Sequence, residues 1–113
     1  MTRYLISFDD GAMAHIPDAD WPAVGRAAHA VVREAKAAGA WIHGGGVQQQ
    51  RASIVGTDGR PANGPFPETK AVIGGFSIID VPTREDALAW AAKMAVACRC
   101  AQEVRVLMDD PEA

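Results

Sequence analysis

Two stretches of helical periodicity, each lying between β-rich runs, constrain the fold of this chain most. In the first, apolar residues recur at helical spacing and define one stripe: Trp21, Val24, Ala28, Val31, Ala35 and Ala38. Gly39 follows this stripe where a helix C-terminal glycine is expected. In the second, the stripe consists of Leu88, Ala91, Ala95 and Cys98. Thr83 and Asp86 precede it as a capping box, so the sequence predicts two long amphipathic helices.

Runs of β-forming residues surround these helices. We predict strands over residues 3–8, 41–47, 52–57, 74–81 and 102–108, with a loop near residues 58–73. The triple glycine at 44–46 indicates a bulge, or a close approach by another backbone or a ligand. The order strand–helix–strand–strand–loop–strand–helix–strand predicts an α+β fold of ferredoxin-like type, with both helices on one side of a single sheet.

The composition narrows the classes of function. The 113 residues are enough for one domain, expected to span residues 1–113. A net charge of −3 without a basic cluster argues against a nucleic-acid partner. No apolar run is long enough to span a membrane, and the first residues resemble a strand and not an export leader. Cys98 and Cys100 are expected to be reduced thiols at a helix end, so we predict a cytoplasmic protein.

One face of the predicted sheet has no helix to cover it. We expect a second copy to cover that face, giving a homodimer that encloses a pocket between two sheets. Strand alternation assigns a mixed polar set of side chains to the pocket. The set consists of Ser7, Asp9, His43, Ser77, Glu103 and Arg105.

Two of the three histidines, His43 and His29, are candidate proton carriers, since imidazole titrates near neutral pH. His43 is the best candidate because it falls in the polar set, although a strand histidine bonded to a neighbour is the simpler interpretation. His29 lies at the edge of the first helical stripe, where a solvated position is the simpler interpretation. His15 follows Asp9 and Asp10, but their spacing matches no standard metal motif, so we predict neither a metal nor another cofactor.

The loop at residues 63–70, Asn-Gly-Pro-Phe-Pro-Glu-Thr-Lys, is the other candidate site. Prolines and glycine restrain it beside a strand, where binding groups often lie. Glu68 and Lys70 would contact a polar substrate or act as acid and base, or else form a surface ion pair of little energetic value. Asn63 and Phe66 are expected to contact a ligand, although turn chemistry explains Asn63 equally well.

This loop and its flanks resemble the DGPF subgroup of the YCII-related superfamily. The resemblance rests on residues 63–66, 68–70, 73–76, 84–91 and 103–105, and it extends to Tyr4-Leu5-Ile6 and Gly44-Gly45. Asn63 stands where the subgroup has an aspartate, so it cannot serve as a carboxylate base. The resemblance implies a ferredoxin-like fold that forms a dimeric α+β barrel. It also implies a catalytic His/Asp pair with the histidine in the first helix, for which His29 is the nearest match.

Two functions follow as alternatives. Most members of the superfamily have no assigned activity, some relatives are enzymes such as a dehydrochlorinase, and DGPF domains also accompany sigma factors. The first alternative is a small cofactor-free lyase or isomerase in which His43 or His29 moves a proton, Arg105 holds an anionic or aromatic substrate and the 63–70 loop closes the site. The second is a non-catalytic module that binds a small ligand or a protein in bacterial signalling.

Overall fold

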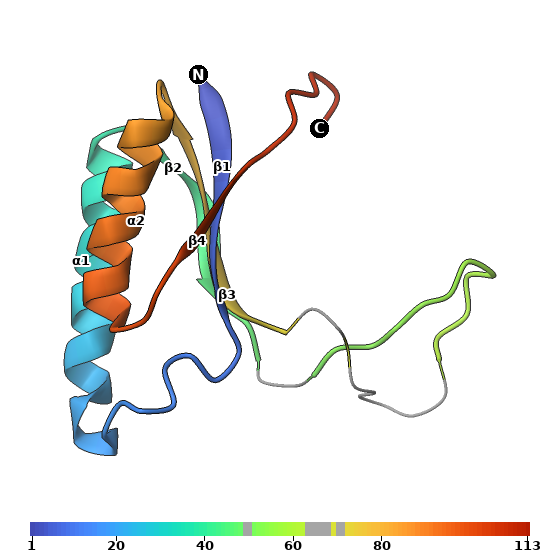
Figure 1. Ribbon diagram of the computed structural model, residues 1–113, viewed down its shortest axis with the longest axis horizontal. Coiled ribbons are helices and arrows are strands. Elements are labelled where there is room, and N and C mark those ends of the chain that lie inside the picture. The colour runs from blue at the N-terminus through green and yellow to red at the C-terminus, as the bar shows by residue number, and fades with distance from the viewer. Residues whose placement is uncertain (49–50, 63–68, 70–71) are drawn as a thin grey trace.

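The computed structural model describes residues 1–48, 51–62, 69 and 72–113 (Figure 1). Its elements, in chain order, are β1 (Thr2–Asp9), the 3₁₀ helix η1 (Asp18–Asp20), α1 (Trp21–Ala37), β2 (Trp41–Gly46), β3 (Ile73–Val81), α2 (Arg84–Cys98) and β4 (Glu103–Val106). The described residues therefore show the predicted α+β class. Neither helix among them is long and apolar enough to cross a bilayer.

The strands form one sheet in the order β2-β3-β1-β4, and every neighbouring pair is antiparallel. β1 lies in the middle, where Tyr4 is opposite both Ile79 of β3 and Val106 of β4. Both helices pack on the same side of this sheet (Figure 1). This arrangement of four strands and two helices is compatible with the predicted ferredoxin-like fold.

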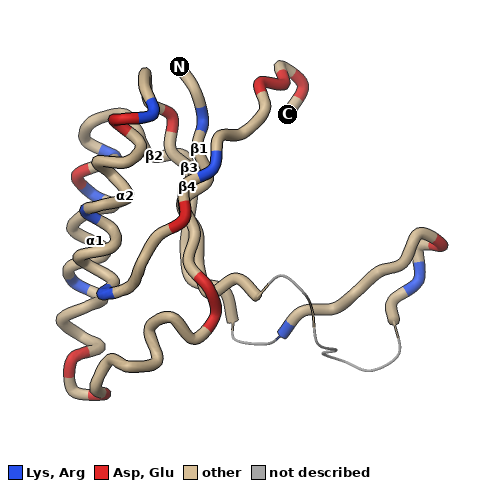
Figure 2. The backbone as a smooth tube through the Cα atoms, viewed as in Figure 1, with Lys and Arg blue, Asp and Glu red and all other residues tan. Residues whose placement is uncertain are grey.

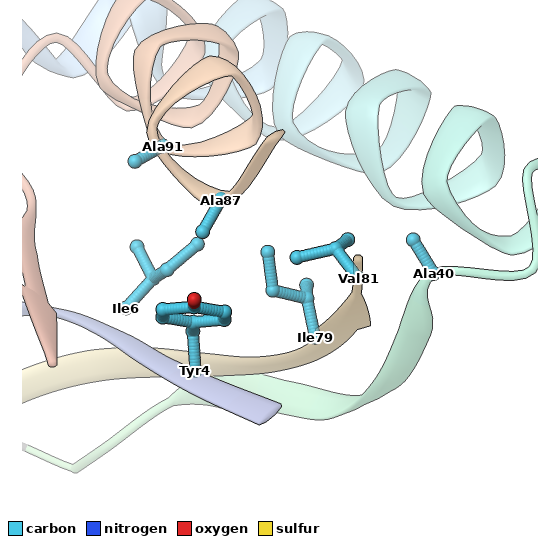
Figure 3. Packing of buried hydrophobic residues seen from close by; sticks show 7 residues of the cluster. All are labelled: Tyr4, Ile6, Ala40, Ile79, Val81, Ala87 and Ala91. Atoms are coloured by element: carbon cyan, nitrogen blue, oxygen red, sulfur yellow. The ribbon is translucent and has the colours of Figure 1, made fainter. Parts of the chain in front are cut away.

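The core lies between the sheet and α2, with Ala40 at the entry to β2 (Figure 3). It consists of Tyr4, Ile6, Ala40, Ile79, Val81, Ala87 and Ala91. Ile6 and Ile79 are the largest side chains that are completely buried. Burying such a side chain stabilises a fold by about 1.5–3 kcal/mol, so these two isoleucines anchor the helices to the sheet.

The helix ends follow local sequence signals. Gly39 has a φ of +73°, the left-handed conformation that ends a helix, as predicted. Thr83 Oγ1 accepts the Asp86 backbone N–H at 3.2 Å and its hydroxyl donates to Asp86 Oδ2 at 3.0 Å. The predicted N-cap of α2 at Thr83 is thereby confirmed.

The helical stripes are confirmed only in part. Val24 and Ala35 of α1 are buried, whereas Trp21 is 40% exposed. In α2, Leu88 is 43% exposed, and the predicted stripe is wrong there. The buried side instead contains Ala87, Ala91, Met94, Ala97 and Cys98. The reason is the small size of the residues: in an alanine-rich helix, apolar spacing fits more than one face.

Both cysteines are free thiols at the end of α2, as predicted. Burial raises the pKa of Cys98 from 9.0 to about 11, and the neighbouring Cys100 adds to this effect. Burial also raises the pKa of Cys100, although a hydrogen bond from Gln102 opposes the change. Both thiols are therefore protonated at neutral pH, which makes them poor nucleophiles.

The strand predicted at residues 52–57 is wrong. Residues 51–62 contain one isolated bridge, between Val55 and Pro61, and all of them are exposed. The hydrogen bonds that flank this bridge run from the Ala62 N–H to Ile54 O and from the Gly56 N–H to Arg60 O, so the bridge belongs to a local turn and not to the four-stranded sheet. The predicted turn at Asp58-Gly59 does form, with the Gly59 N–H donating to Gly56 O at 2.9 Å.

The close approach predicted at the triple glycine of β2 is confirmed, whereas the bulge predicted there lies before it, since Gly44, Gly45 and Gly46 pair in regular register with β3. The register shifts between Trp41 and His43, which indicates a bulge. Gly44 lies so close to β3 that an added Cβ would meet the carbonyl oxygen of Phe76 at 2.5 Å. Only glycine allows this close approach of the two strands.

Candidate functional site on the open sheet face

The side of the sheet away from the helices is the candidate site, and we call it the open face. Cross-strand pairs share a face, so the register identifies its members. They are Arg3, Leu5, Ser7, His43, Phe76, Ile78, Asp80, Glu103 and Arg105.

The open face has an apolar centre and a polar rim. Leu5, Phe76 and Ile78 lie on the two central strands, and each is half-buried in the single chain. His43 flanks this centre on β2, whereas Glu103 and Arg105 flank it on β4. An apolar surface with a few polar groups around it is typical of a small-ligand site or a subunit interface.

His43 occupies one edge of the open face. It is exposed, and its ring lies 6.2 Å from that of Phe76, centroid to centroid, at an interplanar angle of 53°. It pairs with Ile78, while Arg105 pairs with Leu5 at the other edge. Since strands are spaced about 4.8 Å apart, His43 and Arg105 lie about 14 Å apart along one row, too far to act on one small molecule within a single chain.

Arg105 is held by an acidic neighbour at its own edge. Arg105 Nη2 lies 3.1 Å from Glu103 Oε2, and both side chains are more than half exposed. Such a surface ion pair adds little stability. The ion pair therefore orients the Arg105 guanidinium on the open face at a small cost in free energy. A planar guanidinium can bind a carboxylate ligand through two parallel hydrogen bonds.

Asp80, on the open face, has a carboxylate oxygen that receives no hydrogen bond from the described residues. Its Oδ1 is buried and has no hydrogen-bond partner among the described residues. The opposite residue on β1 is Arg3. A buried acceptor without a donor costs about 1–3 kcal/mol, so this end of the open face favours an added donor.

Ser7 and Ser77, both predicted to bind ligand, lie on opposite faces of the sheet. Ser7 is opposite Phe76 and belongs to the open face, although it is 8% exposed. Ser77 is opposite Ile6, so its predicted place beside Ser7 is wrong. It lines a cavity of about 10 Å³ between the sheet and the helices, with Trp41, Trp90 and Met94.

The other candidates lie elsewhere. His29 is exposed on α1, on the far side of the sheet from His43, and His15 is exposed in the loop after β1. Asn63, Phe66, Glu68 and Lys70 fall outside the described residues. Within the described part of the chain, no three His, Cys, Asp or Glu side chains are grouped to hold a metal ion.

A second hollow, of about 720 Å³, lies on the outer side between α1 and α2. Alanine and valine side chains form most of its lining, including Ala27, Ala30 and Val96. The ion pair of Lys93 with Glu34 crosses beside it. Small side chains explain this hollow, and its few polar groups do not converge, so it is the weaker candidate.

Sequence reasoning missed Phe76, Ile78 and Asp80 as members of the open face. The signal was present at the end of β3. Asp80 lies on the same face of the strand as Phe76 and Ile78. The apolar Val81 lies on the other face, with Ser77 and Ile79. A charged residue at a strand end marks the side away from the core, so Asp80 identified the open face.

Comparison with known proteins adds one finding. The model of the YCII-related domain matches residues 13–109, which is most of the chain. The match includes β2, β3, α2 and β4, and with them most of the open face. No curated protein shows a significant match.

Proposed function

Because this chain belongs to the YCII-related domain family, we propose that it acts as a homodimer in which two open faces pack together and enclose a site for a small anionic aromatic ligand. The observation that carries this proposal is the half-buried apolar centre of Leu5, Phe76 and Ile78, which no helix among the described residues covers. A second sheet would remove this surface from water, and each Å² of apolar area contributes about 25 cal/mol.

Pairing of two open faces also completes the polar rim. In one chain His43 and Arg105 are on opposite edges of the sheet. A two-fold axis between the sheets can bring His43 of one copy to the side of Arg105 of the other. The Arg105 guanidinium would bind a carboxylate, Phe76 would stack on a ring, and the Ser7 hydroxyl would add a hydrogen bond.

Catalysis is the second candidate function. The observation that favours it is the place of His43 on the open face, where its imidazole can exchange a proton with a bound ligand. A cofactor-free lyase or isomerase would need this histidine, with Arg105 holding the substrate. The non-catalytic alternative, a binding module in signalling, needs only the apolar centre and Arg105.

The dimer is tested first. We expect sedimentation equilibrium to show a wild-type dimer, and we expect Ile78→Lys to be monomeric because it places a charge in the centre of the interface. Val96→Lys is the matched control, since Val96 is 81% exposed on α2 in the helical layer. It should remain dimeric. If the wild type is monomeric at two protein concentrations that differ about 100-fold, the proposal is contradicted.

The ligand is tested by thermal shift with benzoate as probe. We expect benzoate to raise the melting temperature of the wild type, since a ligand that binds the folded state stabilises it. Arg105→Ala should abolish the shift and His43→Ala should reduce it. His29→Ala, which removes an exposed histidine from the other layer, should leave it unchanged. An equal shift in all four proteins would place the site away from the open face.

A further inference from the structure

The two central strands of the sheet place one basic and one acidic residue side by side at the same end of the open face. The charged residues of β1 and β3 are Arg3, Asp9 and Asp80 (Figure 2). Arg3 is opposite Asp80 in the register, whereas Asp9 ends β1 at the far end of the sheet. At the Arg3 end, the centre of the open face therefore contains one cation and one anion.

Neither charge is matched within the single chain. Asp80 Oδ1 is buried without a hydrogen-bond partner among the described residues. Arg3 is exposed, and the ion pairs within the described part of the chain involve other side chains. Asp80 as a whole is half-buried, and rotation about its last torsion exchanges the two oxygens, so a donor on the open face can reach the carboxylate. A guanidinium is the best such donor, since it can give two parallel hydrogen bonds to one carboxylate.

The proposed homodimer determines what lies opposite these two residues. Placing His43 of one copy beside Arg105 of the other sets β2 of each copy over β4 of its partner. The two-fold axis then runs along the strands, midway between β1 and β3, so β3 of each copy lies over β1 of the other. Rotation about such an axis leaves each residue at its own level along the strands. Asp80 of each copy therefore lies over Arg3 of the other.

The rest of the open face is compatible with this axis, and an axis across the strands is not compatible with Asp80. With the axis along the strands, Ile78 lies over Leu5 of the other copy, and Phe76 lies over Ser7. An axis across the strands would place β3 over β3. Asp80 would then face Phe76, Ile78 or a second Asp80, and none of these side chains is a cation. The unmatched carboxylate therefore favours the axis along the strands.

We propose that Arg3 and Asp80 form two equivalent ion pairs between the copies, one on each side of the two-fold axis, and that these pairs fix the orientation of the dimer. This inference rests on the proposed homodimer. Packed sheets lie about 10 Å apart, a gap that an arginine and an aspartate pointing toward each other can span. Both residues are on central strands, close to the axis, where the angle between packed sheets displaces them least. Complementary charges at an interface fix its register and disfavour arrangements that separate them.

Charge reversal distinguishes a pair between copies from a pair within one chain. Arg3→Asp gives a copy with two acidic residues at this end of the open face, and Asp80→Arg gives a copy with two basic ones. We expect each variant alone to have a dimer dissociation constant raised at least about 30-fold, because like charges then face each other. An equimolar mixture should form a heterodimer, since every acid then faces a base of the other copy. Sedimentation equilibrium gives the dissociation constants, and native mass spectrometry identifies the heterodimer by its mass.

Lys36→Asp, an exposed charge reversal on α1, is the matched control and should leave the homodimer unchanged. A mixture that stays monomeric, although circular dichroism shows that both variants are folded, overturns the inference. Single variants that dimerise as tightly as the wild type overturn it equally. In both cases a dimeric wild type leaves the homodimer standing, whereas a monomeric wild type overturns the homodimer itself.

Neutral variants give a second measurement that does not introduce a reversed charge into the sheet. Arg3→Gln and Asp80→Asn should each raise the dissociation constant about tenfold or more. The double variant should raise it by less than the product of the two effects, because both changes remove the same pairs. Single effects within about twofold of wild type, or effects that simply multiply, contradict the ion pairs between copies.

Discussion

At the scale of single residues, two adjacent glycines of β2 have opposite surroundings. A Cβ at Gly44 would lie 2.5 Å from Phe76 O and 2.9 Å from the Cα of Ser77, both backbone atoms. A Cβ at Gly45 would meet nothing within 4 Å. We expect Gly44→Ala to cost about 2 kcal/mol or more, because β2 and β3 must separate to accommodate the methyl group. Gly45→Ala should be neutral or stabilise by about 0.5 kcal/mol.

Urea unfolding of both variants at one protein concentration measures this difference. Equal stability of the two variants would contradict the close approach of the strands at Gly44. The sequence could predict a bulge or a close contact at the triple glycine, but not which glycine makes it. That depends on the register shift after Trp41, which only the pairing with β3 determines.

At the scale of elements, α2 begins at a cap that the sequence specifies. Thr83 Oγ1 accepts the N–H of Asp86 and its hydroxyl donates to the carboxylate of the same residue. Removing an N-cap hydroxyl costs about 1 kcal/mol, so Thr83→Ala should lower the free energy of unfolding by that amount. Thr83→Ser keeps the hydroxyl and should retain most of the stability. A loss as large in Thr83→Ser as in Thr83→Ala would show that the methyl group, and not the cap, matters.

Elements with strong local signals were predictable, and elements that depend on partners were not. The glycine after α1 and the cap of α2 are local features, and both were predicted. The strand expected at 52–57 had suitable residues, but within the described part of the chain its pairing is one bridge, Val55 with Pro61, because a strand also needs a partner that local propensity does not specify. The buried side of α2 was mispredicted at Leu88, since alanines on several sides make the stripe ambiguous.

At the scale of the whole molecule, the sheet has helices on one side only, and the site depends on which residues face the other. The alternation of β1 was predictable from Tyr4 and Ile6, which are large, mainly apolar and buried. The alternation of β3 was mispredicted because Ser77 is polar yet faces the helices, while the opposing signal from Asp80 at the strand end was not used. The polarity of a single residue is therefore a weak guide to which face of β3 it occupies.

The place of β1 in the sheet has a consequence for how the protein is made. Its two neighbours, β3 and β4, both come from the second half of the sequence, so β1 has no partner while the first half is being synthesised. Pairing over such a long separation is slow, since the closure entropy is lost before the contacts form. The nascent chain must therefore keep its first strand unpaired in the cell until the ribosome has delivered β3.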